Sequence, residues 1–181
     1  MILQYYLSLV QTEEDAKKVE FIYNSFYSAM LYSANSILNN KNDAEDAVHD
    51  AMVKIIEILD IVDFSSTQKL KTFCCIVAKN KAKDMVKRKS NSNVELNESL
   101  AYNTNEKATP EDIVLNKELF TAIENELDSL SDTYKDVCML RFVYEMREKD
   151  IAKLLNLSEK NVSSRVRRGK EIIREKLKGA V

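Results

Sequence analysis

Apolar residues recur at three- and four-residue steps through the first half of the chain, which is the period of an amphipathic helix. Residues 16–38 carry one such series, formed by Val19, Ile22, Tyr23, Phe26, Met30 and Ala34. Residues 43–59 carry a second series, formed by Ala44, Val48, Ala51, Ile55 and Leu59. Asp43 is a residue type that can cap this second helix. A third helix, bent or single, is predicted over residues 69–89 after a loop over residues 61–67, which completes a first helical domain over residues 1–90.

A polar stretch follows this first domain. Residues 90–108 are rich in serine, asparagine and glutamate with little periodicity, so we expect a flexible linker over residues 91–109. The sequence Thr109-Pro110-Glu111-Asp112 is typical of a helix start, because it combines a capping hydroxyl, a proline and two acids at the positive end of the helix dipole. We expect one helix from there to about Leu130 and another from Ser131, within a second helical domain over residues 110–181.

Residues 147–168 have the layout of a helix-turn-helix, in which a short turn joins two helices. Ala152 supplies a small side chain that lets the two helices approach. Asn156 falls where the backbone must turn through a left-handed conformation, and Ser158 is placed to cap the second helix. The second helix should bury a stripe with a small residue in it, formed by Val162, Val166, Gly169 and Ile173.

The rest of this second helix is polar and mostly basic. The major groove of DNA accepts such a helix, because arginine and lysine can reach guanine edges while others neutralise phosphates. An ordinary solvated basic face is the alternative interpretation. The residues predicted to contact DNA from this helix are Lys160, Asn161, Ser163, Ser164, Arg165, Arg167, Arg168 and Lys170.

Composition and charge agree with this organisation. The 181 residues include only two glycines and one proline, too few for the turns of a strand-rich fold, so an all-α protein is expected. The net charge of −2 hides a segregation of charge along the chain. Residues 69–89 hold eight basic residues against one acid, residues 147–178 hold eleven against five, and residues 91–132 hold ten acids against two lysines. Two basic segments predict two places that meet a polyanion.

Few residues are suited to catalysis or metal binding. The three cysteines show no CxxC spacing and His49 is the single histidine, which excludes a structural zinc site. Asp46 and His49 have the spacing of a di-iron carboxylate motif, but such a site needs that motif twice. We therefore expect no cofactor, no metal and no enzymatic activity. No leader or sufficiently long apolar segment is recognised, which favours a cytoplasmic protein without membrane insertion.

The helix-turn-helix belongs to a wider resemblance. Residues 130–177 resemble region four of the sigma-70 family of RNA polymerase sigma factors, and residues 43–59 and 70–89 resemble region two. Both regions occur in the family's order. The short linker between them is similar to that of the extracytoplasmic-function (ECF) group of sigma factors. The departures are local: Leu70 and Phe73 occupy positions where phenylalanine and tryptophan are common, Asn156 replaces a common glycine, and residues 145–147 replace a small glycine-containing turn. No particular promoter sequence is therefore predicted.

The resemblance implies that the protein binds core RNA polymerase, with the helix over residues 43–59 docking on the clamp helices of the β′ subunit and a further contact on the β flap. An acidic rim around an apolar residue suits a basic helical partner, because charge steers association and buried area supplies affinity. A solvated acidic face is the alternative. The residues predicted to dock are Asp43, Asp46, His49, Asp50, Val53 and Glu57.

The basic helix over residues 69–89 resembles the element that grips the minus-ten promoter region, where the non-template strand is held after its bases leave the stack. Lysines at four-residue steps can contact phosphates, Asn80 can read a base edge, and Phe64 or Phe73 can stack on an exposed base. For Phe73 a place in the core is favoured, since its neighbours are apolar. The residues predicted to hold this DNA are Phe64, Lys71, Phe73, Lys79, Asn80, Lys83, Lys87 and Arg88.

The function implied by the resemblance is promoter-specific initiation of transcription. The helix-turn-helix would read the minus-thirty-five element as duplex, and the linker would span the gap between the two elements. Promoter melting needs no catalytic residue, because a protein that binds the open strand better than the duplex shifts that equilibrium. The family also implies an anti-sigma factor as a partner. A DNA-binding regulator that never joins polymerase is the alternative, although it leaves the acidic helix without a role.

Overall fold

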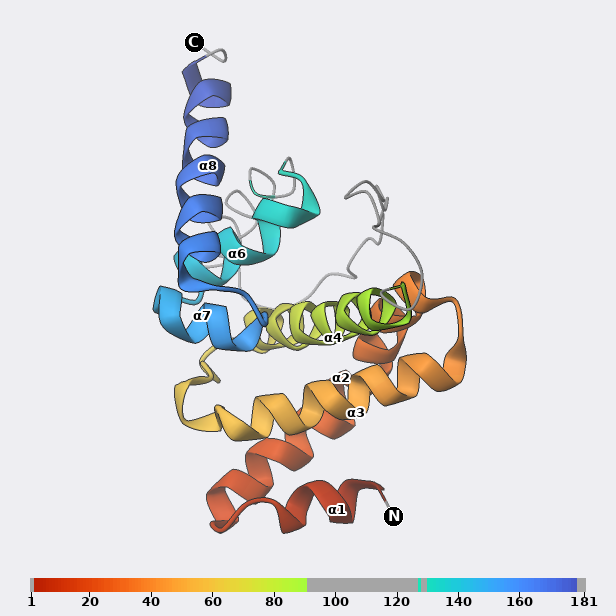
Figure 1. Cartoon of the computed structure of the whole chain (residues 1–181). Helices are drawn as coiled ribbons and strands as arrows, with labels where there is room; N and C mark the ends of the chain where they lie inside the picture. The colour runs from red at the N-terminus through yellow and green to blue at the C-terminus, as the bar shows by residue number, and fades with distance from the viewer. Residues whose placement is uncertain (1, 91–126, 128–129, 179–181) are drawn as a thin grey trace. The chain divides into compact units, whose positions relative to one another are not determined.

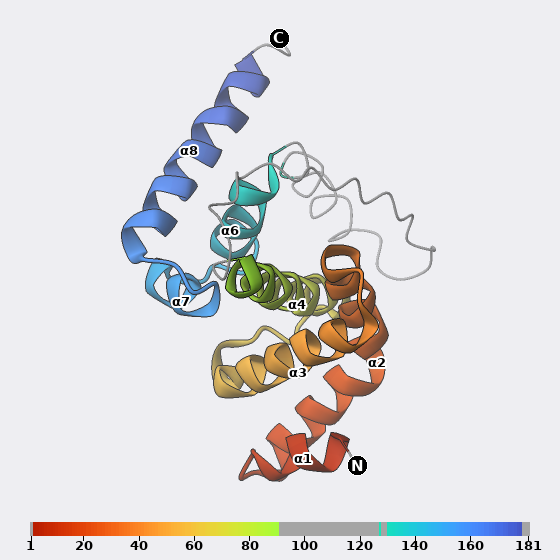
Figure 2. The same cartoon turned by 45° about the vertical axis from the view of Figure 1, so that its right-hand side comes forward.

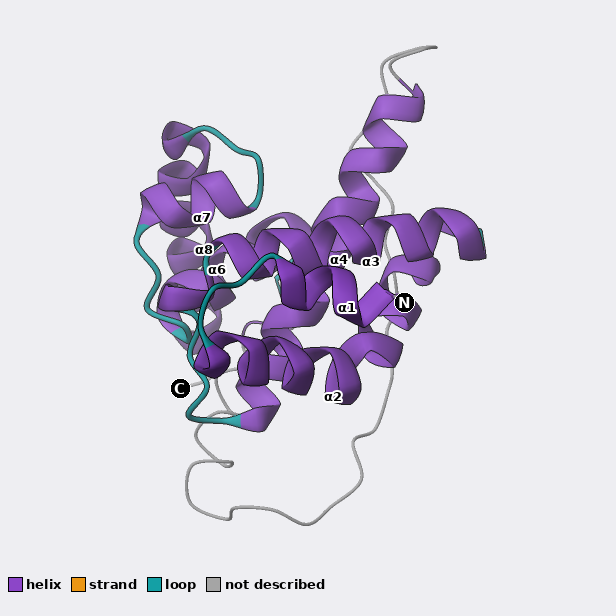
Figure 3. Ribbon diagram, turned by 90° about the horizontal axis from the view of Figure 1, so that it is seen from below, coloured by secondary structure: helices purple, strands orange, loops and turns teal. Residues whose placement is uncertain are grey.

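The computed structural model describes residues 2–90, 127 and 130–178. Every regular element in these ranges is a helix, and Figure 3 shows no strand among them, so the all-α prediction is confirmed for this part of the chain. The chain divides into two compact units, Met1–Leu96 and Asn97–Val181, each of which is described by itself. The predicted linker over residues 91–109 and most of the helix predicted from Thr109 lie outside the described residues.

The first unit is built around three long helices, α2 (Glu13–Leu38), α3 (Lys41–Glu57) and α4 (Thr67–Ser90). Figures 1 and 2 show them side by side, and each packs against the other two. The short 3-10 helix η1 (Leu59–Ile61) and residues 62–66 join α3 to α4. The predicted apolar series of α2 and α3 supply the core, with fully buried side chains that include Ile22, Met30, Val48, Ala51 and Ile55.

The start of α3 differs from the prediction. Asn39 takes a left-handed conformation with φ of 49°, which ends α2 and leaves Asn40 in the capping position of the next helix. The side-chain oxygen of Asn40 accepts a hydrogen bond from the Asp43 backbone N–H at 3.1 Å. Asp43 was therefore the wrong cap, because the tight turn at Asn39 starts α3 at Lys41. Asp43 lies in the first turn, where its carboxylate pairs with Lys89 Nζ of α4 at 2.6 Å.

A helix that the apolar pattern did not predict begins the chain. Helix α1 (Ile2–Ser8) contacts both α2 and α3, and its Tyr6 is fully buried. Seven residues make only two turns, which is too short a segment for a periodic series to be recognised. The tertiary contacts of Tyr6 hold α1 in place, since an isolated helix of this length is unstable in water.

The second unit contains α6 (Asp132–Phe142), α7 (Glu148–Leu154) and α8 (Glu159–Lys178). Helix α8 packs on both of the others. The core of the second unit is formed by apolar residues from all three helices, which include Val137, Leu140, Ile151, Leu154 and Val162. Leu127 and Leu130 are also buried. The unit is small, so the position of α8 depends on a few close contacts.

One of these close contacts is at Gly169 of α8. A Cβ atom built on Gly169 would lie 2.3 Å from Cys138 Sγ of α6, a distance that real Cβ contacts do not show. The predicted close approach of another helix at this glycine is therefore confirmed, and the partner is α6. Burial raises the pKa of the Cys138 thiol to about 11, so the thiol is neutral at physiological pH and packs as a small apolar group.

Replacing Gly169 tests this packing. We expect Gly169→Ala to lower the free energy of unfolding by about 1–3 kcal/mol, because the methyl group overpacks the contact with Cys138. In a Cys138→Ala background the same change should be neutral or stabilising, since the clash is gone and alanine favours a helix by about 1 kcal/mol over glycine. Urea unfolding of the four proteins gives the comparison. An equal loss in both backgrounds would contradict the contact.

Candidate functional site

The turn between α7 and α8 has the geometry predicted for a helix-turn-helix. Asn156 takes a left-handed conformation with φ of 52°. This conformation lets the Leu157 N–H donate to the Ala152 carbonyl at 2.9 Å, the bond that closes the end of a helix before a sharp turn. Ser158 Oγ then accepts a hydrogen bond from the Asn161 N–H at 3.2 Å, as expected of a cap. The predicted roles of Asn156 and Ser158 are confirmed.

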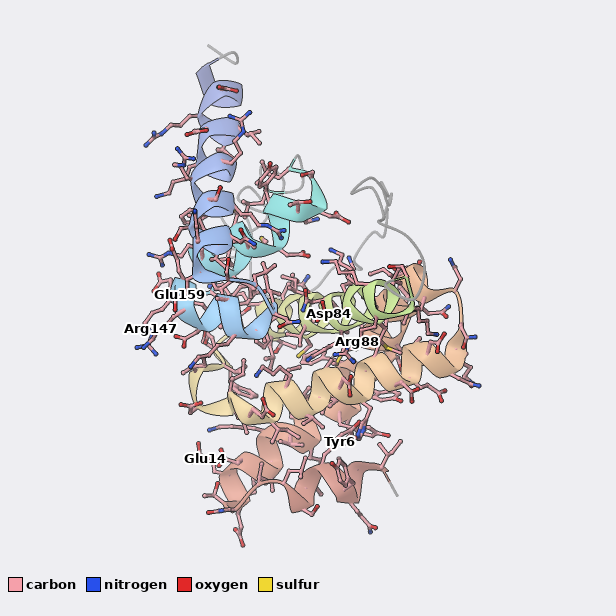
Figure 4. All side chains as sticks on the ribbon, in the orientation of Figure 1. Tyr6, Glu14, Asp84, Arg88, Arg147 and Glu159 are labelled. Atoms are coloured by element: carbon pink, nitrogen blue, oxygen red, sulfur yellow. The ribbon has the colours of Figure 1, made fainter. Side chains whose placement is uncertain are left out.

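Helix α8 turns its apolar stripe inward and its polar residues outward. Val162 and Val166 are buried against the rest of the unit, whereas Ile173 is only half-buried. Most of the predicted DNA-contacting residues are exposed and Arg165 is half-buried; the exposed ones are Lys160, Asn161, Ser163, Ser164, Arg167, Arg168 and Lys170. Figure 4 shows side chains projecting from the helix from its start near Glu159 onward.

Three of the cationic side chains of α8 are engaged within the second unit. Arg165 Nη1 donates to the Thr133 carbonyl at 3.5 Å, which ties α8 to the start of α6. Arg168 pairs with Glu171 at 3.2 Å. Lys170 Nζ lies 5.1 Å from the centre of the Phe142 ring. Each of these groups has an interaction to lose before it can contact another molecule.

Other polar side chains of α8 are unengaged. Among the described residues, the side chains of Lys160, Ser164 and Arg167 make no hydrogen bond, ion pair or ring contact with one another or with the rest of the unit. All three are exposed within the first half of the helix. Among the neighbouring arginines Arg165, Arg167 and Arg168, Arg167 is therefore the one whose guanidinium is both exposed and uncommitted.

Glu148 is a residue of this site that the sequence did not reveal. Its Oε2 accepts a hydrogen bond from Ser163 Oγ, so the first turn of α7 is tied to the second turn of α8. The contact joins residues separated by fifteen positions on two helices, and no local pattern predicts such a pairing. Ser163 is thus held by Glu148 rather than freely presented, although its side chain remains exposed.

The basic helix α4 presents part of its predicted set to solvent. Lys71, Lys87 and Arg88 are exposed, while Lys79 and Lys83 are half-buried. Phe73 is only 3% exposed, so its ring belongs to the core of the first unit and cannot stack on a base in this conformation. The prediction that Phe73 contacts DNA is not supported by this burial, and the alternative of a core residue is confirmed.

Asn80 and Asp84 lie one turn apart on α4. Asn80 Nδ2 is buried and has no hydrogen-bond partner among the described residues, so it would have to rotate outward before reading a base edge. Burial raises the pKa of Asp84, while the nearby cations Lys87, Lys81 and Arg88 oppose that rise. Figure 4 labels Asp84 and Arg88 along this helix. A carboxyl group thus lies among the basic residues of α4.

Phe64 lies in an ordered loop before α4. The Ser65 N–H donates to the Asp63 carboxylate at 2.8 Å, and the hydrogen bonds from Ser65 lower the pKa of Asp63. The Lys18 ammonium group of α2 lies 5.8 Å from the centre of the Phe64 ring, which is half-buried. The Phe64 ring of the loop and the Lys18 ammonium group of α2 therefore lie next to each other.

The residues of α3 that were predicted to dock on polymerase differ in whether they already have a partner within the first unit. Asp43 is paired with Lys89, and Glu57 accepts from Lys54 Nζ at 2.8 Å. His49 Nδ1 is joined to the Tyr6 hydroxyl by a hydrogen bond of 3.0 Å. Asp46 and Asp50 are exposed, with no hydrogen bond or ion pair to any described residue, and Val53 is half-buried on the following turn. These last three form what we call the acidic face: Asp46, Asp50 and Val53.

Nothing in the described part of the chain resembles a metal centre or a membrane segment. No group of three histidine, cysteine, aspartate or glutamate side chains within residues 2–90, 127 and 130–178 is placed to hold a metal ion. No described helix is both long and apolar enough to cross a membrane. The exposed charged faces of α3, α4 and α8 are thus the features that need a functional explanation.

Comparison with known proteins identifies the class to which these faces belong. Residues 22–92 match sigma-70 region 2, and residues 120–173 match sigma-70 region 4. The chain belongs to the sigma-70 family of RNA polymerase sigma factors, and it functions in promoter-specific initiation of transcription. Because both regions are present in this order, the alternative of a regulator that carries only the helix-turn-helix is disfavoured.

A curated relative narrows the assignment. The ECF RNA polymerase sigma factor SigW of Bacillus subtilis (strain 168) is 27% identical over 150 residues, which cover 78% of this chain and 79% of SigW. The protein is a sigma factor of the ECF group. Membership of this family implies binding to core RNA polymerase and to promoter DNA.

Proposed function

We propose that the three charged faces divide the work of promoter recognition. Helix α8 reads the minus-thirty-five element as duplex, α4 with the loop before it holds the minus-ten element, and α3 docks on the clamp helices of the polymerase β′ subunit. The observation that carries this proposal is the exposed cationic face of α8, with Arg167 and Lys160 uncommitted on a capped helix-turn-helix. The boundary between the two working parts falls in the predicted linker, residues 91–109.

The first half of α8, from Glu159 to Arg168, suits a base-reading role. In helix-turn-helix proteins the early residues of the second helix lie deepest in the major groove. Arg167 has the fork of donors that pairs with the O6 and N7 acceptors of guanine. Lys160, Asn161 and Ser164 are exposed nearby and complete a face of donors. Arg165 and Arg168, which are engaged within the unit, contribute mainly positive charge.

The α4 face suits a single strand. The exposed Lys71, Lys87 and Arg88 supply phosphate contacts. Phe64, held in an ordered loop beneath the Lys18 ammonium group, is the ring available for stacking on an unpaired base. Affinity for the unpaired strand would favour the open promoter, and the polymerase performs the chemistry.

The acidic face of α3 suits a basic helical partner. Asp46 and Asp50 are free of local pairing, so their carboxylates can steer and bind cationic side chains. Val53 adds a small apolar contact on the next turn. We also propose that the second unit contacts the β flap and that an anti-sigma factor regulates the protein, as its family membership suggests.

Transcription in vitro tests the proposed function directly. Purified core RNA polymerase supplemented with this protein should produce run-off transcripts from specific start sites that core polymerase alone does not produce. Sequencing the transcript ends would locate the two elements upstream. If transcripts arise only when a second sigma factor is added, the protein is a regulator and the proposal is wrong.

Charge reversal on the acidic face tests the docking surface. We expect Asp46→Arg combined with Asp50→Arg to abolish binding to core polymerase, because two cations would then face a basic partner. DNA binding by the second unit should be unchanged. A matched control is Glu13→Arg combined with Glu20→Arg, which changes the charge equally at exposed positions of α2. Equal core affinity for all three proteins, measured by fluorescence titration, would contradict the docking assignment.

Arg167→Ala tests base reading by α8. If Arg167 reads a base, the substitution should cost about 1–3 kcal/mol on the preferred minus-thirty-five sequence and relax selectivity at one position. If it contacts only phosphate, affinity should fall uniformly across sequences and the salt dependence should weaken. The control is Arg174→Ala, an exposed arginine two turns farther along the same helix. Selection from a randomised duplex library distinguishes these results.

A further inference from the structure

Helix α1 lies directly beside the acidic face of α3. The Tyr6 hydroxyl and His49 Nδ1 are 3.0 Å apart, and the centres of the Tyr6 and His49 rings are 5.5 Å apart. Tyr5 contacts the same histidine from α1, with ring centres 5.4 Å apart. His49 lies on α3 one turn before Val53, at the edge of the acidic face, so the two tyrosines bring α1 to that edge.

Tyr6 is the residue that fixes α1 in this position. It is fully buried, and its ring also lies 5.9 Å from that of Tyr23 in α2. Burial raises the pKa of Tyr6, so the hydroxyl is neutral and remains available for its hydrogen bond to His49. Figure 4 labels Tyr6 within this first unit. Helix α1 is therefore positioned by a buried aromatic contact and not only by chain connectivity.

The outer side of α1 is apolar and exposed. Ile2, Tyr5 and Leu9 follow one another at steps of three and four residues and are 47%, 48% and 41% exposed. Single exposed apolar residues are common on protein surfaces, but Ile2 and Tyr5 on one side of α1 and Leu9 in the turn directly after it form a group, and grouped exposed apolar residues are a sign of a contact with another molecule. Tyr5 joins this apolar side to His49 and hence to the acidic face.

We propose that α1 is the apolar half of the surface that docks on core RNA polymerase, an inference that rests on the proposed function of α3. The acidic face alone offers two carboxylates and one half-buried valine, which supply charge but little apolar area. Protein interfaces combine an apolar centre with a charged rim. Ile2, Tyr5 and Leu9 supply that apolar centre, and the occupant is an amphipathic helix with basic and apolar side chains, as the acidic neighbours require.

Tyr6 and His49 act as positioning residues in this arrangement. Their hydrogen bond and ring contact couple α1 to α3, so the apolar and acidic halves are presented together. His49 is consequently directed toward α1 and does not itself need to touch the partner. This differs from the role first predicted for it as a docking residue.

The test compares two matched double variants of the full chain. Tyr5→Ser with Leu9→Ser removes apolar groups from α1 and the turn after it, whereas Phe21→Ser with Tyr32→Ser removes similar groups, 43% and 57% exposed, from α2. We expect the α1 variant to bind core polymerase at least about tenfold more weakly than the wild type, and the α2 variant to bind nearly normally. Thermal unfolding and binding of duplex DNA by the second unit should be unchanged in both.

Tyr6→Phe provides a second reading, because it keeps the buried ring and removes only the hydroxyl that reaches His49. We expect a smaller loss of core affinity, about two- to fivefold, without unfolding. Normal core affinity of the α1 variant, alongside lost binding by Asp46→Arg with Asp50→Arg, would overturn the role of α1 and leave the docking role of α3 intact. Normal binding by both would overturn the docking proposal itself. Altered self-association at normal core affinity, seen by sedimentation, would assign α1 to contacts between copies of this chain and overturn the inference.

Discussion

Helices α3 and α8 of this sigma factor each bury an apolar face, and that constraint decides which of their side chains face outward. In α3 the stripe of Ala44, Val48, Ala51 and Ile55 is fully buried, so Asp46 and Asp50 are turned outward. In α8 the buried Val162 and Val166 turn Arg167 outward in the same way. Because the helical period relates the two faces rigidly, the charged surfaces are set by the core and keep their geometry without contacts of their own.

Features that depend on local sequence could be predicted, and features that depend on contacts between distant segments could not. The helical stripes, the left-handed turn at Asn156, the cap at Ser158 and the small residue at Gly169 follow from short-range rules. The cap of α3, which is Asn40 and not the predicted Asp43, depends on the left-handed turn at Asn39, and helix α1 depends on tertiary contacts of Tyr6. Pairings across long separations gave no sequence signal, namely Lys89 with Asp43, Ser163 with Glu148 and Arg165 with Thr133.

The structure also separates charged residues that look equivalent in the sequence. Arg165, Arg167 and Arg168 are neighbours on α8, yet the first and third are engaged within the unit and only Arg167 is uncommitted. On α3, Asp43 and Glu57 are paired with lysines whereas Asp46 and Asp50 are not. An engaged charge must exchange one partner for another on binding, and the net gain is then small. We therefore expect the uncommitted charges to contribute more to the proposed recognition than the engaged ones.

Asn80 of α4 is uncommitted in a different way, because its side-chain amide is buried and still has no hydrogen-bond partner among the described residues. A buried donor without an acceptor costs about 1–3 kcal/mol relative to one that is satisfied. Asn80 Nδ2 has no acceptor among the described residues, so swinging it outward breaks no hydrogen bond. Rotation of this side chain is opposed only by its packing. The Nδ2 group of Asn80 would therefore be stabilised more by an acceptor on another molecule than by the fold of the free protein.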